Sequence, residues 1–325
     1  MMRIVPVPPI PPGMLVMARA GKLVPFVGAG ASSLVGYPDW AGFGANALQF
    51  CVEEGLLNHA DISQLRHLAP RTQLSVASSI CRSHGRPLDL GRCLEPRIAA
   101  EGASVRRLAE AIWRLSRTVV TTNYDTCLHG PLPSIPSAQQ ADSPPPTPLL
   151  PDIISKREDL MSGLIPGNRK VIHLHGSILF PEHAIVTVEQ YIQHYAAPQA
   201  DDGSDGHVRD FLSTLFENRA VVFMGYGLGE MEVLEYVLPR GGRPTTGSDD
   251  TRHFILQGFF SHEEALAIHL ERYYRESLGV ALIPYSRDLE DWGGMVRALE
   301  GIGSTLPEAD ATLISRQMEM DGLLQ

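Results

Sequence analysis

The sequence predicts an α/β fold, in which a Rossmann-like parallel sheet is covered by helices on both faces and carries a smaller helical module. Short apolar segments typical of strands buried on both faces alternate with longer segments of helical periodicity. Strands that alternate with helices favour a parallel sheet. Apolar residues make up 44% of the 325 residues, so the chain can bury a large core.

The first third of the chain is expected to be mostly helical around one strand. A helix over 14–21 leads into the apolar segment 23–27, which is short enough for a buried strand. The segment 39–54 has an apolar stripe at helical spacing that contains Trp40, Phe43, Leu48 and Cys51. Residues 61–115 continue this helical pattern.

The rest of the chain repeats the alternation of strand and helix. Apolar strand segments are expected at 118–122 and within the stretches 170–177, 219–227, 253–259 and 280–286. Helical patterns lie between most of them, at 187–195, 207–217, 230–238 and 261–277, and 308–325 is predicted as one amphipathic helix.

The sequence divides into three parts. A proline-rich arm, 1–13, precedes the main domain, 14–302, and a helix or tail follows at 303–325. Within the main domain the helical module covers approximately 39–115. The segment 131–151 holds eight prolines and is predicted as a flexible loop, either a flap over a pocket or a passive insertion. The segment 239–251 is a second flexible connection.

Charge and cysteine content exclude several classes of protein. The 27 Lys and Arg residues against 37 Asp and Glu residues give a net charge of −10, which disfavours nucleic acid or an anionic membrane as main partner. No C-x-x-C pair occurs among the four cysteines, so neither a zinc site nor another metal site is expected. No apolar stretch is long enough for a membrane span, and early prolines disfavour a signal peptide. We therefore expect a cytoplasmic protein.

Small or polar residues follow four of the predicted strands, at the edge of a parallel sheet where ligands bind. Their convergence predicts one shared pocket. The four segments are Gly28-Ala29-Gly30-Ala31-Ser32, Thr122-Asn123-Tyr124-Asp125, His175-Gly176-Ser177 and Gly225-Tyr226-Gly227-Leu228. The first segment differs from the dinucleotide fingerprint G-x-G-x-x-G, because Ser33 stands where the third glycine would be. A dehydrogenase is therefore disfavoured.

These segments, in this order, resemble the sirtuin superfamily over roughly residues 15–290. "GAGAS" followed by "GYPD" resembles the sirtuin nucleotide loop, and "TTNYD" and "HG" resemble its two catalytic stretches. The resemblance implies a Rossmann-like domain that binds NAD⁺ as its substrate and cleaves the nicotinamide–ribose bond. Such a cleavage passes through an oxocarbenium-like ribose, so the site needs positioned polar groups more than a strong nucleophile.

The resemblance also implies a role for each matched residue. The backbone of residues 28–32 would bind the pyrophosphate, Asn123 would orient the ribose and an attacking water, and Asp125 would hold the nicotinamide amide. His175 would be the base for a ribose hydroxyl or water, and residues 225–227 would line the adenosine side. The candidate catalytic residues are thus Asn123 and His175, and the candidate NAD⁺-binding residues are Gly28, Ala29, Gly30, Ser32, Asp39, Thr122, Tyr124, Asp125, Gly225, Tyr226 and Gly227.

Each of these residues also has a structural interpretation. Asn123 can close a turn after its strand, and Asp125 can cap a helix. Tyr124 and Tyr226 can be ordinary core aromatics. His173, two residues before His175 in the same predicted strand segment, is interpreted as structural.

Departures from the family decide which activity is expected. Sirtuin deacylases carry two zinc-binding C-x-x-C pairs after the catalytic histidine, whereas the last cysteine here, Cys127, precedes His175. Ala41 stands where deacylases usually have an arginine. The chain resembles instead prokaryotic sirtuin-like NAD⁺ hydrolases, which defend against bacteriophage by emptying the cell of NAD⁺. The alternatives are a deacylase or ADP-ribosyltransferase, and a non-catalytic module that senses NAD⁺ or ADP-ribose.

An NAD⁺ hydrolase must be controlled, because constant activity would kill its host. The sequence after residue 290 is too short for a sensor domain, so we expect control by a homo-oligomer or by a separate partner. The resemblance implies a DNA-translocase-type ATPase or a short argonaute as such a partner. Whether the product is ADP-ribose or its cyclised form stays open.

Overall fold

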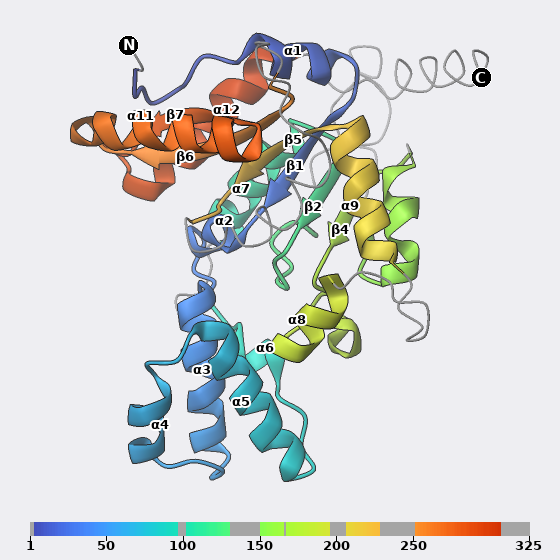
Figure 1. Ribbon diagram of the computed structural model, residues 1–325, viewed down its shortest axis with the longest axis vertical. Coiled ribbons are helices and arrows are strands. Elements are labelled where there is room, and N and C mark those ends of the chain that lie inside the picture. The colour runs from blue at the N-terminus through green and yellow to red at the C-terminus, as the bar shows by residue number, and fades with distance from the viewer. Residues whose placement is uncertain are drawn as a thin grey trace, which may run out of the picture.

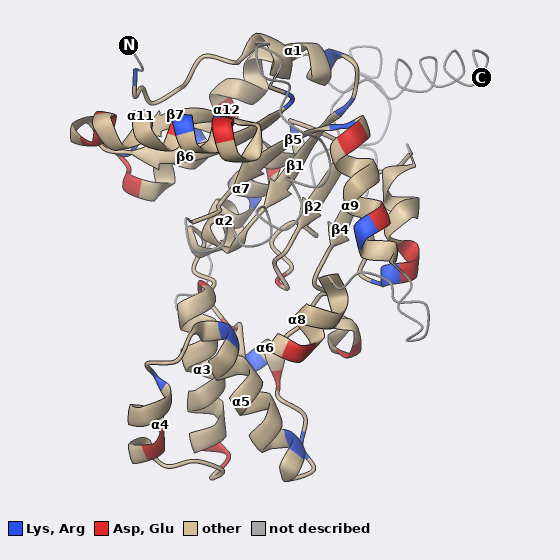
Figure 2. Ribbon diagram, in the orientation of Figure 1, with Lys and Arg blue, Asp and Glu red and all other residues tan. Residues whose placement is uncertain are grey.

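The computed structural model describes residues 3–96, 102–130, 150–165, 167–195, 206–227 and 251–306. The predicted fold class is confirmed, since a seven-stranded, all-parallel sheet carries helices on both faces. Figure 1 shows this sheet lobe above a separate helical lobe. Figure 2 shows that basic and acidic residues are interspersed over both lobes.

The strand order, β3-β4-β2-β1-β5-β6-β7, places β1 (Leu23–Val27) at the centre between β2 (Thr118–Thr121) and β5 (Ala220–Met224). The other strands are β3 (Asp152–Ile154), β4 (Lys170–His173), β6 (His253–Phe259) and β7 (Val280–Ser286). The six predicted strands are thus confirmed. The edge strand β3 was not predicted, because its three residues directly follow the proline-rich segment and are too few to show a periodicity.

Alternate residues of the strands point to two separate cores. Along β1, Leu23 and Val27 pack with one group of helices, and Val24 and Phe26 pack on the opposite face. The first face is covered by α1 (Pro12–Arg19), α7 (Gly102–Trp113) and α12 (Gly294–Thr305), and the second by α9 (His207–Asn218), α11 (Glu264–Tyr273) and the 3₁₀ segment η1 (Arg157–Leu164). Helix α12 was not predicted, since its glycines lower the helix propensity of the segment.

The helical lobe has its own core. It contains α3 (Trp40–Glu53), α4 (His59–Leu65), α5 (Pro70–Ser83) and α6 (Leu90–Cys93), and α3 begins at Asp39, whose side chain accepts from the Gly42 N–H at 2.7 Å. Helix α7 lies within the range assigned to the helical module from the sequence, 39–115, but its apolar face packs against the sheet. Helix α8 (Val188–Tyr195) lies between the lobes and contacts both α5 and α9.

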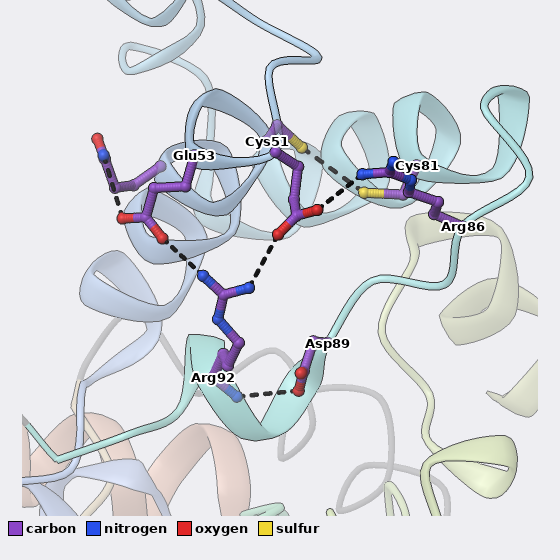
Figure 3. Close-up of polar contacts among 8 residues, drawn as sticks. Cys51, Glu53, Cys81, Arg86, Asp89 and Arg92 are labelled. Atoms are coloured by element: carbon purple, nitrogen blue, oxygen red, sulfur yellow. Dashed lines mark hydrogen bonds and ion pairs between the residues drawn. The ribbon is translucent and has the colours of Figure 1, made fainter.

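Cysteines and ion pairs connect helices of the helical lobe to one another (Figure 3). The buried sulfur atoms of Cys51 and Cys81 lie 3.7 Å apart and join α3 to α5. On the surface, Arg92 pairs with Glu53 at 3.0 Å and with Glu54 at 2.9 Å, joining α6 to the end of α3. Burial raises the pKa of the Cys51 thiol to about 12, with Cys81 adding to the shift, so the thiol is protonated at neutral pH.

The N-terminal arm lies along the sheet edge. Val5 forms a parallel bridge with Tyr285, and the Ser286 N–H donates to the Val5 carbonyl at 3.0 Å. Among the described helices, none combines the length and apolarity that crossing a bilayer requires. The predictions for 131–149, 230–238, 239–250 and 308–325 lie outside the described residues.

The loops after β1 and β5 meet backbone to backbone at the point where the strand order reverses. The Gly30 N–H donates to the Gly225 carbonyl at 2.8 Å, and Gly225 has a φ of +70°. A Cβ atom on Gly225 would lie 2.4 Å from the Ala31 nitrogen, and one on Gly30 would lie 2.8 Å from the Gly225 carbonyl oxygen. Only glycine fits at this contact, which fixes the positions of the two loops relative to each other.

Replacing Gly225 should therefore destabilise the protein. We expect Gly225→Ala to lower the free energy of unfolding by about 2–4 kcal/mol, because it adds both a steric clash and an unfavourable positive φ. The matched control is Gly227→Ala, since a Cβ atom on Gly227 would meet no atom of the described residues within 4 Å. Urea unfolding of both variants measures the difference, and equal stabilities would contradict the packing described here.

Candidate functional site

Asn123, directly after β2, ties the site loop to the small-residue turn after β1. Its side-chain nitrogen donates to the Gly28 carbonyl at 3.0 Å and to the Ser32 hydroxyl at 2.9 Å. The carbonyl of Gly28 can only accept, so the amide nitrogen must be the atom that faces it. Both amide hydrogens are then used, and the side-chain oxygen of Asn123 is the atom left to accept a hydrogen bond in the adjoining pocket.

Asp125 belongs to the same network. It is 7% exposed, its Oδ1 accepts from the Cys127 N–H at 2.9 Å, and it is also hydrogen-bonded to the Ser32 side chain. Burial raises the pKa of the Asp125 carboxyl, and the hydrogen bonds from Ser32 and Cys127 oppose that shift. Ser32 thus connects Asn123 to Asp125, so the three side chains act as one unit.

The small-residue turn itself is held tightly by the sheet. The N–H groups of Gly28 and Gly30 donate to the carbonyls of Met224 and Gly225, at 2.9 and 2.8 Å. These two amides are therefore engaged within the protein, and pyrophosphate binding by the turn stays a prediction. Ala29 and Ser32 of the short helix α2 (Ala29–Ser33) line the pocket beside Asn123.

The pocket lies where the sheet lobe meets the helical lobe. Its free space is about 20 Å³, which holds about one water molecule. Its walls combine the aromatic rings of Trp40, Phe43 and Tyr124 with polar groups from the ends of β1 and β2. The lining residues are Ala29, Ser32, Pro38, Asp39, Trp40, Phe43, Leu94, Thr122, Asn123, Tyr124 and Asp125. In this conformation a nucleotide does not fit, so binding one requires the pocket to widen.

Tyr124 joins the two lobes at the pocket. Its ring packs against Phe43 at 5.6 Å and Trp40 at 6.1 Å between ring centres, and its hydroxyl donates to the Ile185 carbonyl at 2.5 Å. The Ile178 N–H donates to the Tyr124 carbonyl at 2.9 Å. Tyr124 therefore fixes the loop after β2 to both the helical lobe and the loop after β4.

The segment after β5 contributes less to this pocket. The Tyr226 hydroxyl lies 2.9 Å from the Thr122 hydroxyl, but its ring packs in the sheet core against Phe26 and Phe223. Gly227 is exposed and does not line the pocket. Binding of the adenosine side by residues 225–227 stays a prediction.

His175 lies beside the pocket residue Tyr124 and is not part of the pocket lining. The two rings lie 6.4 Å apart between centres, yet His175 is 1% exposed and does not line the pocket. Helix α8 covers it, and its Nε2 is hydrogen-bonded to the Tyr195 hydroxyl at 2.8 Å. Burial lowers the pKa of His175 well below its ordinary value, and the charges of His194 and Arg71 lower it further.

The contact between α8 and His175 is incompletely satisfied. Nδ1 of His175 and both ring nitrogens of His194 are buried and make no hydrogen bond of standard geometry to a described residue, although the backbone groups of Thr122 and Leu174 lie close enough to raise the pKa values of the two histidines.

Several residues of the site were not singled out from the sequence, namely Arg71, Tyr191, His194 and Tyr195. The guanidinium of Arg71 lies 3.8 Å from the centre of the Tyr191 ring, and the rings of Tyr191 and Tyr195 both contact His175. The available signal was the spacing of Tyr191, His194 and Tyr195, which places three rings on one face of the predicted helix 187–195.

Comparison with known families identifies the fold. Residues 117–283, just over half of the chain, match the SIR2-like domain family. The chain belongs to this family. The match contains Asn123 and His175, whereas the small-residue turn and Asp39 lie before it. No curated protein matched the sequence.

Members of the SIR2-like family are NAD-dependent enzymes, so the domain implies use of NAD⁺. The donor set is compatible with it, because the Asn123 oxygen can accept from a hydroxyl or water and aromatic walls suit a flat cationic ring. Within the described ranges, no group of three or more His, Cys, Asp or Glu side chains is arranged to hold a metal ion.

The buried histidines should make stability depend on pH. Burial lowers the pKa of His129 and His253 to about 4 and that of His173 and His194 to about 3. These groups stay neutral in the folded protein, whereas they take up a proton near pH 6.5 in the unfolded chain. The stabilisation is therefore complete above pH 6.5 and is lost as the pH falls toward 3–4, by up to about 1.4 kcal/mol per pH unit for each histidine.

Urea unfolding at several pH values between 7.5 and 5 measures this slope. The variant His253→Gln, on β6 and away from the pocket, should reduce the slope by about one proton. A free energy of unfolding that does not change over this range would contradict the neutral, buried state of the histidines.

Proposed function

We propose that the protein is an NAD⁺ hydrolase that cleaves the nicotinamide–ribose bond to give nicotinamide and ADP-ribose. The observation that carries the proposal is the position of Asn123. Two hydrogen bonds fix its amide nitrogen and leave its side-chain oxygen to accept, and the residue lines an aromatic-walled pocket in a SIR2-like domain. An acceptor oxygen there can orient a ribose hydroxyl or an attacking water.

The reaction needs few groups from the protein. The C1′–N1 bond breaks and its electron pair goes to the ring nitrogen, which makes nicotinamide neutral. Water then adds its oxygen to C1′ and loses a proton. Asn123 would orient that water, and Asp125 would hold the nicotinamide amide so that the leaving group stays in place. His175 would take the proton once Tyr195 releases its Nε2.

Hydrolysis is favoured over deacylation by residues that the chain lacks. The sequence has no C-x-x-C pair to build the zinc module of sirtuin deacylases, and Ala41 replaces their usual arginine. A non-catalytic NAD⁺ sensor is the remaining alternative. It would need no base, whereas this chain keeps both Asn123 and His175.

The closed site favours a regulated enzyme. The pocket has room for about one water, and α8 covers His175, so turnover requires the site to open. We propose that self-assembly or a separate sensor protein, such as a DNA-translocase-type ATPase or a short argonaute, provides that opening in the cytoplasm. The biological role would be depletion of NAD⁺ during bacteriophage infection.

Turnover of NAD⁺ tests the proposed reaction. Purified protein should release nicotinamide and ADP-ribose from NAD⁺ without any peptide, and Asn123→Ala and His175→Ala should each reduce the rate at least about 100-fold. The exposed residue His269 on α11 provides the control His269→Ala, which should keep the full rate. Circular dichroism checks that each variant is folded.

The other outcomes decide between the alternatives. Nicotinamide release that requires an acetylated peptide would indicate a deacylase. Binding of NAD⁺ without release, with and without partner proteins, would indicate a sensor.

The regulatory proposal predicts that activity depends on assembly. Size-exclusion chromatography with light scattering, combined with activity at increasing protein concentration, should show that the specific rate rises as oligomers form or when a partner is added. A monomer with the full rate would contradict it.

A further inference from the structure

Two histidines, His173 and His129, are linked to the Asn123 backbone by hydrogen bonds and have no part in the reaction proposed above. His173 ends β4 and is 1% exposed, and its backbone pairs in register with Thr121 at the end of β2. His129 lies six residues after Asn123 on the same loop and is partly buried. The sequence alone predicts only a structural role for His173.

The two imidazoles form a chain that ends on the backbone of Asn123. Nδ1 of His173 lies 2.7 Å from the Asn123 carbonyl oxygen, and Nε2 of His173 lies 2.7 Å from Nε2 of His129. The rings of the two histidines are nearly perpendicular, at 85°, which allows the second hydrogen bond to be well aligned.

Hydrogen-bond chemistry fixes the proton on each ring. A carbonyl oxygen only accepts, so Nδ1 of His173 must carry hydrogen and, in the neutral ring, Nε2 must be the acceptor. His129 must then donate from its own Nε2, which leaves its Nδ1 without hydrogen. That Nδ1 is indeed buried and makes no hydrogen bond to any described residue. Each ring therefore has one defined tautomer.

His173 holds both ends of the loop 123–129. One ring nitrogen contacts the backbone where the loop begins, and the other contacts His129 where it ends. Inside the loop, the Cys127 N–H donates to Asp125, and the Trp113 indole donates to the Leu128 carbonyl at 3.3 Å. Asn123, Tyr124 and Asp125, which line the pocket, are all carried by this loop.

We propose that His173 and His129 are positioning residues, which hold the Asn123 backbone so that its side-chain oxygen stays directed at the pocket. The inference rests on the proposed function for its effect on NAD⁺ cleavage, whereas the tautomers and the geometry of the loop do not depend on that function. Burial lowers the pKa of His173 to about 3 and that of His129 to about 4, so both rings are neutral at pH 7, as the hydrogen bonds require.

The kinetic test uses pairs of variants that remove or retain each hydrogen bond. We expect His173→Phe to reduce kcat for NAD⁺ about 10–100-fold with little change in KM, because a displaced Asn123 affects orientation more than binding. His173→Asn, whose amide nitrogen can replace Nδ1 as donor, should recover most of the rate. His129→Leu should lower kcat and His129→Gln, which can still donate, should recover it, while His269→Gln serves as the unaffected control.

A second measurement needs no turnover. NMR spectra of protein labelled with ¹⁵N-histidine, at pH 7 and without NAD⁺, should show hydrogen on Nδ1 of His173 and on Nε2 of His129. The Asn123 side-chain amide signals should shift in His173→Phe and return toward the wild-type position in His173→Asn.

The outcomes separate the two proposals. Opposite tautomers, unchanged Asn123 signals in His173→Phe, or equal loss of kcat in His173→Phe and His173→Asn would overturn the positioning role. Wild-type protein that never cleaves NAD⁺ but shows the expected tautomers and Asn123 shifts would overturn the proposed function and support the positioning of Asn123.

Discussion

The contact between the loops after β1 and β5 is the constraint on which the site depends. At this point the order of the parallel strands reverses, and such reversals leave a crevice at the sheet edge. Here the crevice is closed by the backbone of Gly30 against that of Gly225. The Gly28 carbonyl is thereby held where the Asn123 amide reaches it, so a contact between glycines sets the direction of the Asn123 side chain.

The same arrangement explains why the site is closed. The Tyr124 ring packs against the helical lobe, and its hydroxyl and backbone carbonyl are hydrogen-bonded to the segment after β4. Beside it, α8 packs over His175. The pocket is therefore bounded by parts of two lobes, and a change in their separation changes its volume.

The sequence predicted the sheet well because each strand is a short apolar segment with a clear boundary. Segments too short or too rich in glycine to show a period, β3 and α12, were missed. At the site, the motifs predicted correctly which loops follow neighbouring strands. They could not show that the amides of Gly28 and Gly30 are used within the sheet or that α8 covers His175, because both depend on distances between segments far apart in the chain.

The parallel bridge between Val5 and Tyr285 has a consequence for how the protein reaches its native state. During synthesis Val5 is made long before Tyr285, so its place beside β7 does not exist until residue 285 has been made. The central strand β1 likewise cannot complete its pairing early, since its partner β5 follows almost two hundred residues later. Contacts of such long separation slow folding, so Val5 and the edge of β1 that faces β5 stay unpaired until their partners have been made.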